Sequence, residues 1–323
     1  MTTAPLAHLD AAPTVADIEA AAARIAERLS GSPVIERPDL NARLGRRVLL
    51  KNETRMPGGS FKIRGALNRL LQLAESEREA GVVAFSSGNH GQAVALAAKW
   101  LGLAATIVMP ADAPRVKIAG VENAGANLVL YDRWSEDREA IAANIAAERG
   151  ATLVPAFDDP MIIAGAGTVG LELARFARAT NVDLGLAAAP CSGGGLMAGS
   201  GLALRASFPG IRLFAVEPEG YDDTAQSLAA GRRLRLNAFP PSRCDALLVN
   251  QPGALTFELN RRQLTGAVTV TDAEVTEAMA VAAGLDVILE PSGAAAFAAL
   301  LAGKLPQGAE PVAIVLSGGN LDP

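Results

Sequence analysis

The chain has 323 residues, half of them hydrophobic, which is enough for a sizeable core in one large or two moderate domains. A net charge of −5 and an aromatic content of 4% argue against a nucleic-acid-binding surface, so the expected partner is a small molecule. Two cysteines (Cys191 and Cys244) and two histidines (His8 and His90) are too few for a disulfide framework or a zinc site, so any metal must use oxygen ligands.

The N-terminus shows no basic segment followed by an apolar core, and no apolar run approaches the roughly 18 residues of a membrane span. We therefore expect no membrane association and a cytoplasmic location. The first predicted element is a helix over residues 15–29. Thr14 and Asp17 resemble a capping box at its start, and apolar side chains recur along one of its faces.

From Val48 onward, short apolar strands alternate with longer helical patterns, which is typical of parallel sheets with helices on both faces. Between about residues 220 and 266 the periodicity weakens, which predicts a long irregular excursion. The predicted strands are residues 48–50, 81–85, 104–109, 127–131, 151–154, 184–189, 212–216, 267–270 and 312–316, and the predicted helices are residues 92–100, 113–123, 136–148, 161–180, 196–207, 272–284 and 292–302.

A single lysine stands at the start of a further helix, predicted from about residue 61 to residue 77. A Pro-Gly-Gly break precedes Ser60, which is a suitable N-cap, and Lys62 falls in the first turn. There the helix dipole and desolvation both favour the neutral amine, which is the form that attacks a carbonyl to make a Schiff base. An ordinary exposed helix lysine is the alternative, and this stretch alone does not decide between them.

Four loops follow predicted strands, at the edge where open parallel sheets bind ligands. Residues 85–92 offer hydroxyls, an amide and backbone donors that suit a carboxylate, or they form a plain polar turn. Residues 191–199 contain three consecutive glycines, which suit a compact monophosphate or serve tight packing; they lack the lysine of a nucleotide-binding loop. Residues 316–320 either present a hydroxyl at the sheet edge or form a plain terminal turn. Residues 216–223 carry carboxylates, which either bind a divalent cation or form a solvated acidic turn.

Residues 165–170 spell a dinucleotide-binding fingerprint, but no full strand precedes them and no acidic residue ends a second strand at the required spacing. We interpret these glycines as sites of close packing.

Taken together, these motifs resemble the fold-type II pyridoxal-phosphate enzymes, in particular the serine/threonine dehydratase and serine racemase family, which includes hydroxyaspartate dehydratases. The resemblance covers nearly the whole chain in the family's order. It implies an α/β fold of two open twisted parallel sheets flanked by helices, similar to the tryptophan synthase β subunit, and a homodimer. The motifs are residues 59–66, 86–92, 192–195, 290–294 and 317–320.

By this resemblance, Lys62 would form a Schiff base with pyridoxal 5'-phosphate and then act as base on the substrate Cα. Ser87 would be the second acid/base, on the opposite face of the cofactor, and would permit racemisation. A neutral Ser317 facing the pyridine nitrogen would make the ring a weaker electron sink, which suits β-elimination. The implied cofactor-binding residues are Phe61, Lys62, Asn89, Ser192, Gly193, Gly194, Gly195, Leu196, Glu290 and Ser317, and the implied substrate-binding residues are Ser86, Ser87, Gly88, Asn89 and His90.

The resemblance also implies a divalent cation, Mg²⁺, Mn²⁺ or Ca²⁺, held by the carboxylates of Glu217 and Asp223 and the backbone carbonyl of Tyr221. Three positions bear on the subfamily. Gly58 replaces a usual threonine in a loop that contacts effectors, and Phe85 replaces a histidine of the mammalian racemases. Phe157 matches the dehydratases better than the racemases.

We expect a large domain of residues 1–80 and 157–323, with a small domain of residues 81–156 that closes over the substrate. The expected function is an ammonia-lyase for a β-hydroxy-α-amino acid, with L-threonine and L-serine as first choices. The alternatives are a threo-3-hydroxyaspartate or phenylserine dehydratase, with Arg133 or Arg138 binding a β-carboxylate, and an amino-acid racemase. A non-catalytic amino-acid-binding protein on the same scaffold is the alternative from another class.

Overall fold

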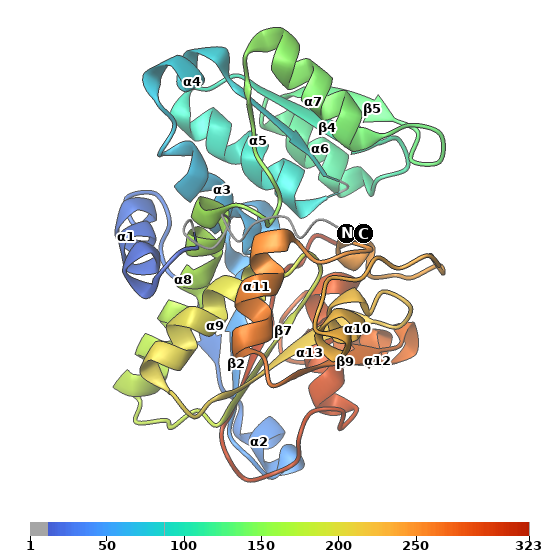
Figure 1. Ribbon diagram of the computed structural model, residues 1–323. Coiled ribbons are helices and arrows are strands. Elements are labelled where there is room, and N and C mark those ends of the chain that lie inside the picture. Colours follow the sequence, from blue (N-terminus) through green and yellow to red (C-terminus); the bar gives the residue numbers. More distant parts are fainter. Residues whose placement is uncertain (1–11, 87, 323) are drawn as a thin grey trace.

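The computed structural model describes residues 12–86 and 88–322, and it contains two separate sheets (Figure 1). Every strand pair is parallel except β1 with β2. The six-stranded sheet has the order β1 (Val34–Ile35), β2 (Val48–Asn52), β10 (Val312–Leu316), β7 (Leu186–Pro190), β8 (Arg212–Pro218), β9 (Gly266–Val270), and the four-stranded sheet has the order β5 (Asn127–Tyr131), β4 (Ala105–Pro110), β3 (Val82–Phe85), β6 (Thr152–Leu153).

Helices cover both faces of each sheet, as the alternating pattern predicted. We call the four-stranded sheet with α5, α6 and α7 the small-sheet half, and the six-stranded sheet with α8 to α13 the large-sheet half. The helices are α1 (Val15–Ile25), α2 (Pro38–Leu44), α3 (Lys62–Leu70), α4 (Glu75–Ala80), α5 (Asn89–Leu101), α6 (Arg115–Asn123), α7 (Arg138–Arg149), α8 (Pro160–Ala179), α9 (Gly195–Ser207), α10 (Asp223–Ala230), α11 (Ala254–Gln263), α12 (Asp272–Ala283) and α13 (Pro291–Leu301), with 3₁₀ turns η1 (Glu53–Arg55), η2 (Pro57–Gly59) and η3 (Asp245–Leu247).

The core is divided between the two halves. In the large-sheet half, α8 and α9 pack on one face of the sheet and α12 and α13 pack on the other. In the small-sheet half, α5 and α6 pack on one face and α7 on the other. Helix α3 contributes to the small-sheet core, because Ile63 and Leu67 belong to the same hydrophobic cluster as Val82, and Figure 1 shows this helix between the two sheets. The division at residues 80/81 and 156/157, and a closing motion, stay predictions.

The start of α3 differs from the sequence prediction. Ser60 is not a helix cap, because its backbone is extended and forms a β-bridge with Gly318, while Phe61 takes the N-cap position without a side-chain bond. The predicted helix over residues 61–77 is also broken, since the side chain of Glu77 accepts a hydrogen bond from the Ala74 amide and so starts a new helix, α4. Lys62 still lies in the first turn, as predicted.

Helix α8 approaches its neighbours through the glycines of the fingerprint-like segment. A Cβ at Gly165 would lie 2.5 Å from the carbonyl oxygen of Arg64 on α3, and one at Gly170 would lie 2.4 Å from that of Ser200 on α9. The interpretation of these glycines as packing sites is therefore confirmed. Across the described residues, no helix combines the length and the apolar character that crossing a lipid bilayer requires.

Candidate active site

Lys62 is the first residue of α3, and its amine lines a cavity at the carboxyl ends of β10 and β7. The Phe61 amide donates to the Ser317 carbonyl at 3.1 Å, which holds the start of α3 against the end of β10. The Nζ atom of Lys62 donates to the Ala156 carbonyl at 2.8 Å. Desolvation lowers the pKa of Lys62 from 10.5 to about 8, so the neutral amine is far more populated near neutral pH than in an ordinary lysine.

The triple-glycine loop follows β7 and opens α9 on the same cavity. Side chains from α11 hold two of its carbonyls: Thr256 Oγ1 donates to the Gly193 oxygen and Asn260 Nδ2 donates to the Gly194 oxygen at 3.0 Å. The amides of residues 192–197 find no acceptor among the described residues and stand at a helix N-terminus. A Cβ at Gly193 would lie 2.4 Å from the ring of Phe157, so the loop is closely packed from behind. This arrangement suits a phosphate.

Within the loop of residues 86–90, the side chain of Asn89 is held by two hydrogen bonds. Its Nδ2 atom donates to Glu290 Oε1, and its Oδ1 atom accepts from Asn320 Nδ2 at 2.8 Å. One Nδ2 hydrogen remains for a ligand in the cavity that Asn89, Glu290 and Ser317 line. The hydroxyl of Ser317 makes no hydrogen bond within the described part of the chain.

The remaining predicted substrate-binding residues differ in their surroundings. Ser86 Oγ accepts from the Gly88 amide at 3.1 Å, and neither residue is among those that line the cavity of Lys62 or the small adjoining one. His90 lies in the adjoining cavity beside Lys62, with Nε2 3.0 Å from the Val154 carbonyl. Desolvation, together with the charge of Lys62, lowers the pKa of His90 to about 3, so its ring is neutral. Ser87 lies outside the described residues.

A buried ion network beneath α3 was not predicted from the sequence. Arg64 bonds Glu53 Oε2 at 2.7 Å and Glu172 Oε1 at 2.6 Å, while Lys51 bonds Glu172 Oε2 at 2.6 Å. Arg64, Lys51 and Glu53 are buried, and the two positive and two negative charges balance. The network ties α3 to β2, η1 and α8 and thereby fixes the helix that carries Lys62.

The predicted cation ligands lie at the turn between β8 and α10. Glu217 is buried and accepts hydrogen bonds from the amides of Thr224 and Ala225 at 2.8 and 2.9 Å. Asp223 is also buried, and both of its carboxylate oxygens lack a hydrogen-bond partner among the described residues. Burial, and second the charge of Glu217, raise the pKa of Asp223 to about 8. An unpaired buried carboxylate of this kind fits a hard cation.

The described residues contain no group of three or more histidine, cysteine or acidic side chains that could hold a metal ion. A site here therefore depends on the backbone carbonyl of Tyr221 or on water for further ligands. The phenol of Tyr221 donates to the Pro240 carbonyl at 3.0 Å, which anchors this turn.

A groove between the two halves is lined by residues 131–139 on one side and residues 239–249 on the other. Ala246 lines both the groove and the cavity of Lys62, so the groove lies next to the candidate site. The two arginines considered for a β-carboxylate differ here. Arg133 is paired with Asp112 at 2.7 Å, whereas Arg138 has no ion pair within the described ranges and lies 5.5 Å from the centroid of the Phe85 ring.

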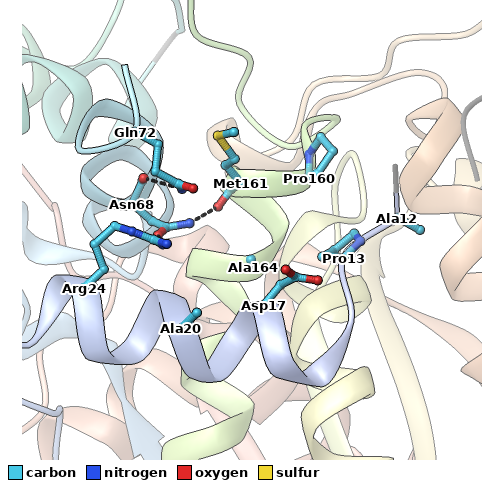
Figure 2. A pocket seen from close by; sticks show the side chains of 10 residues that line it. All are labelled: Ala12, Pro13, Asp17, Ala20, Arg24, Asn68, Gln72, Pro160, Met161 and Ala164. Carbon is cyan, nitrogen blue, oxygen red and sulfur yellow. Dashed lines mark hydrogen bonds between the residues drawn. The ribbon is translucent and has the colours of Figure 1, made fainter. Parts of the chain in front are cut away.

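A second hollow lies between α1, α3 and α8 (Figure 2). Arg24 donates to Asn68 Oδ1 at 2.5 Å, and Asn68 Nδ2 donates to the Met161 carbonyl at 2.6 Å. The side chains of Arg24, Asn68 and Gln72 thus already have hydrogen-bond partners, and the described lining of this hollow includes neither Lys62 nor the glycine loop.

A lysine, a glycine-rich amide cradle and a fixed asparagine at the carboxyl ends of parallel strands define an α/β enzyme site for a phosphorylated carbonyl cofactor. The chain matches the family described as pyridoxal-phosphate-dependent enzymes over residues 25–318, and it belongs to that family.

Among its relatives, the chain is 40% identical to L-threo-3-hydroxyaspartate ammonia-lyase of Saccharomyces cerevisiae, covering 96% of this chain and 94% of the relative. It is 38% identical to serine racemase of Schizosaccharomyces pombe, with coverage of 96% and 95%. The solved structure of maize serine racemase superposes with a TM-score of 0.91 at 36% identity, covering 96% and 94% of the two chains. These similarities confirm the predicted family and the fold-type II architecture, and the protein is a pyridoxal-phosphate-dependent enzyme.

Proposed function

We propose that this protein is an ammonia-lyase for β-hydroxy-α-amino acids. The observation that carries the proposal is the Lys62 amine, with its pKa lowered to about 8, in one cavity with the glycine loop, Asn89 and Ser317. When bound, pyridoxal phosphate withdraws electrons from the substrate Cα and so makes its proton acidic.

The residues have distinct roles in this proposal. Lys62 supplies the amine that holds the cofactor and, once released, the base that receives the Cα proton. The amides of residues 192–196 would hold the phosphate, and the second Nδ2 hydrogen of Asn89 would be available to the cofactor's phenolic oxygen. Glu290 orients Asn89, Phe61 and Ser317 line the cavity, and the neutral hydroxyl of Ser317 would be the partner of the pyridine ring. Ser87 is proposed as the second acid/base from the sequence motif alone.

The overall reaction balances as a dehydration followed by a hydrolysis. The substrate loses its Cα proton and its β-hydroxyl, which leave as one water molecule. The resulting enamine tautomerises to an imine, and one water molecule converts this to a 2-oxo acid and ammonia. L-Threonine and L-serine meet the chemical requirement with the smallest side chains.

L-threo-3-Hydroxyaspartate is a second candidate substrate, because Arg138 stands beside the site loop. Phe85 is the last residue of β3, directly before that loop, and its ring supports the Arg138 guanidinium at 5.5 Å. Arg138 is not paired with a described carboxylate, so it is available to a substrate β-carboxylate. The similarity to a hydroxyaspartate ammonia-lyase supports the same choice.

A substrate panel of L-serine, L-threonine, L-threo-3-hydroxyaspartate and phenylserine, read for both 2-oxo acid and inverted amino acid, tests the function. We expect 2-oxo acid as the main product. Arg138→Gln should lower kcat/KM for hydroxyaspartate by about tenfold or more, which corresponds to about 1.4 kcal/mol, and change that for serine little. Arg133→Gln is the matched control, because that arginine is paired with Asp112. Inverted amino acid without 2-oxo acid would contradict the proposal.

We also propose that Glu217, Asp223 and the Tyr221 carbonyl bind Mg²⁺, Mn²⁺ or Ca²⁺, because the buried carboxylate oxygens of Asp223 have no hydrogen-bond partner among the described residues. A homodimer and a cytoplasmic location complete the proposal and rest on the family resemblance and the composition.

A further inference from the structure

Lys117 forms an ionic contact that crosses between the two halves of the molecule. It lies on α6 of the small-sheet half, and its side chain is 1% exposed. Its Nζ atom is 2.6 Å from Asp245 Oδ2 and 3.0 Å from Glu290 Oε2. Asp245 begins η3 and Glu290 precedes α13, so both carboxylates belong to the large-sheet half.

The same lysine reaches the loop that carries Asn89. A Cβ at Gly88 would lie 2.8 Å from Lys117 Cδ, so the lysine side chain passes directly against this loop. Glu290, which Lys117 contacts through Oε2, accepts the Asn89 Nδ2 hydrogen bond through Oε1. Lys117 and Asn89 therefore contact the two oxygens of the same carboxylate.

Stability alone does not account for a lysine at this place. A buried ion pair is commonly no more stable than well-packed apolar side chains of the same volume, because both ions lose their hydration. Here one ammonium meets two carboxylates, one of them fully buried, and the contact joins α6 to η3 and the start of α13, whose apolar side chains belong to a different hydrophobic cluster from those of α6. The contact instead fixes the positions of α6, η3 and the Asn89 amide relative to one another.

We propose that Lys117 is a positioning residue that fixes the Asn89 amide at the cofactor site and clamps the small-sheet half onto the large-sheet half. The first part of this inference rests on the proposed function, and the second part does not. When α6 moves away from η3, Glu290 loses its counter-charge and Asn89 loses its fixed acceptor, so an open arrangement also holds the cofactor less firmly.

The test compares Lys117→Met with wild type by two measurements. We expect the dissociation constant of pyridoxal phosphate to rise about tenfold, because Glu290 loses its counter-charge and no longer holds the Asn89 amide in place. In the cofactor-free protein, amide hydrogen exchange of residues 115–123 and 245–247 should accelerate about tenfold. Lys99→Met is the matched control, because exposed Lys99 donates to the Asn123 carbonyl at the other end of α6 without leaving the small-sheet half. It should change neither quantity more than about twofold.

A folded Lys117→Met protein with wild-type cofactor affinity and wild-type exchange would overturn the proposal. If this variant does not fold, Asp245→Asn decides, because it removes the more exposed carboxylate and leaves the contact with Glu290. Faster exchange of residues 115–123 in that variant supports the clamp, and unchanged exchange refutes it. Failure of the wild-type protein to bind pyridoxal phosphate would refute the proposed function, while the exchange measurement would still judge the clamp.

Discussion

Gly194 shows how single residues build the phosphate cradle. Its φ of +93° lies in the region that glycine adopts without strain, and α9 begins at the next residue. A Cβ there would also lie 2.7 Å from Asn260 Nδ2 and 3.1 Å from Thr256 Cβ, the two side chains that hold the loop from α11. A side chain at this position therefore strains the backbone and displaces its support.

Gly194→Ala tests the cradle. We expect a stability loss on the order of 1 kcal/mol and a loss of pyridoxal-phosphate affinity of about tenfold or more. Gly102→Ala is the control, because Gly102 also has a positive φ, of +66°, but has open space around it. It lies at the C-terminal end of α5 and does not belong to the glycine loop. This variant should show the stability loss in urea unfolding and retain wild-type affinity. Equal affinities in the two variants would refute the role of the glycine loop.

Among the helices and strands, the sequence predicted the ones whose buried face is apolar. The predicted strands at residues 127–131 and 312–316 match β5 and β10. The irregular excursion predicted over residues 220–266 is confirmed for residues 231–253, which contain η3 but no α-helix or strand, whereas α10 and α11 occupy its two ends and were not predicted. Helix α11 buries the polar side chains Thr256, Asn260 and Gln263 against the glycine loop and α9, so it shows no apolar periodicity.

The importance of the ion network that supports α3 can be tested by substituting Arg64. Arg64→Met leaves buried Glu53 and Glu172 short of one positive charge, so the free energy of unfolding should fall by about 3–5 kcal/mol. Arg47→Met, which breaks the exposed pair with Glu36, should cost less than about 1 kcal/mol. Urea unfolding of both variants measures the difference. A loss at Arg64 as small as that at Arg47 would mean that the network does not hold the helix.

Binding of a divalent cation can be tested at the turn between β8 and α10. Mg²⁺ or Mn²⁺ should raise the melting temperature of the wild-type protein, because the ion compensates the buried carboxylates. Asp223→Asn should abolish this rise, whereas Asp222→Asn should keep it, since the neighbouring Asp222 bonds Gln226 on α10. A rise that survives Asp223→Asn would place the cation elsewhere.

At the scale of the whole molecule, the site is assembled from both halves. The motifs placed Lys62, the glycine loop and Ser317 correctly at one sheet edge, because glycines and strand ends leave a local pattern. Lys117, Asp245, Thr256 and Asn260 were missed, since each is a polar residue whose partner is distant in the sequence. Only the three-dimensional arrangement shows that Asn89, from the small-sheet half, and Glu290, from the large-sheet half, meet in one cavity.

The decisive measurement adds pyridoxal phosphate to the apo protein over a range of pH, traps the product with borohydride at intervals and locates it by peptide mass analysis. We expect a reduced pyridoxyl adduct on Lys62. Because the neutral amine is the nucleophile, the rate of cofactor attachment to the apo protein should rise with pH and level off above about 8, well below the 10.5 of an ordinary lysine. An unmodified Lys62, or an adduct on another lysine, would contradict the account.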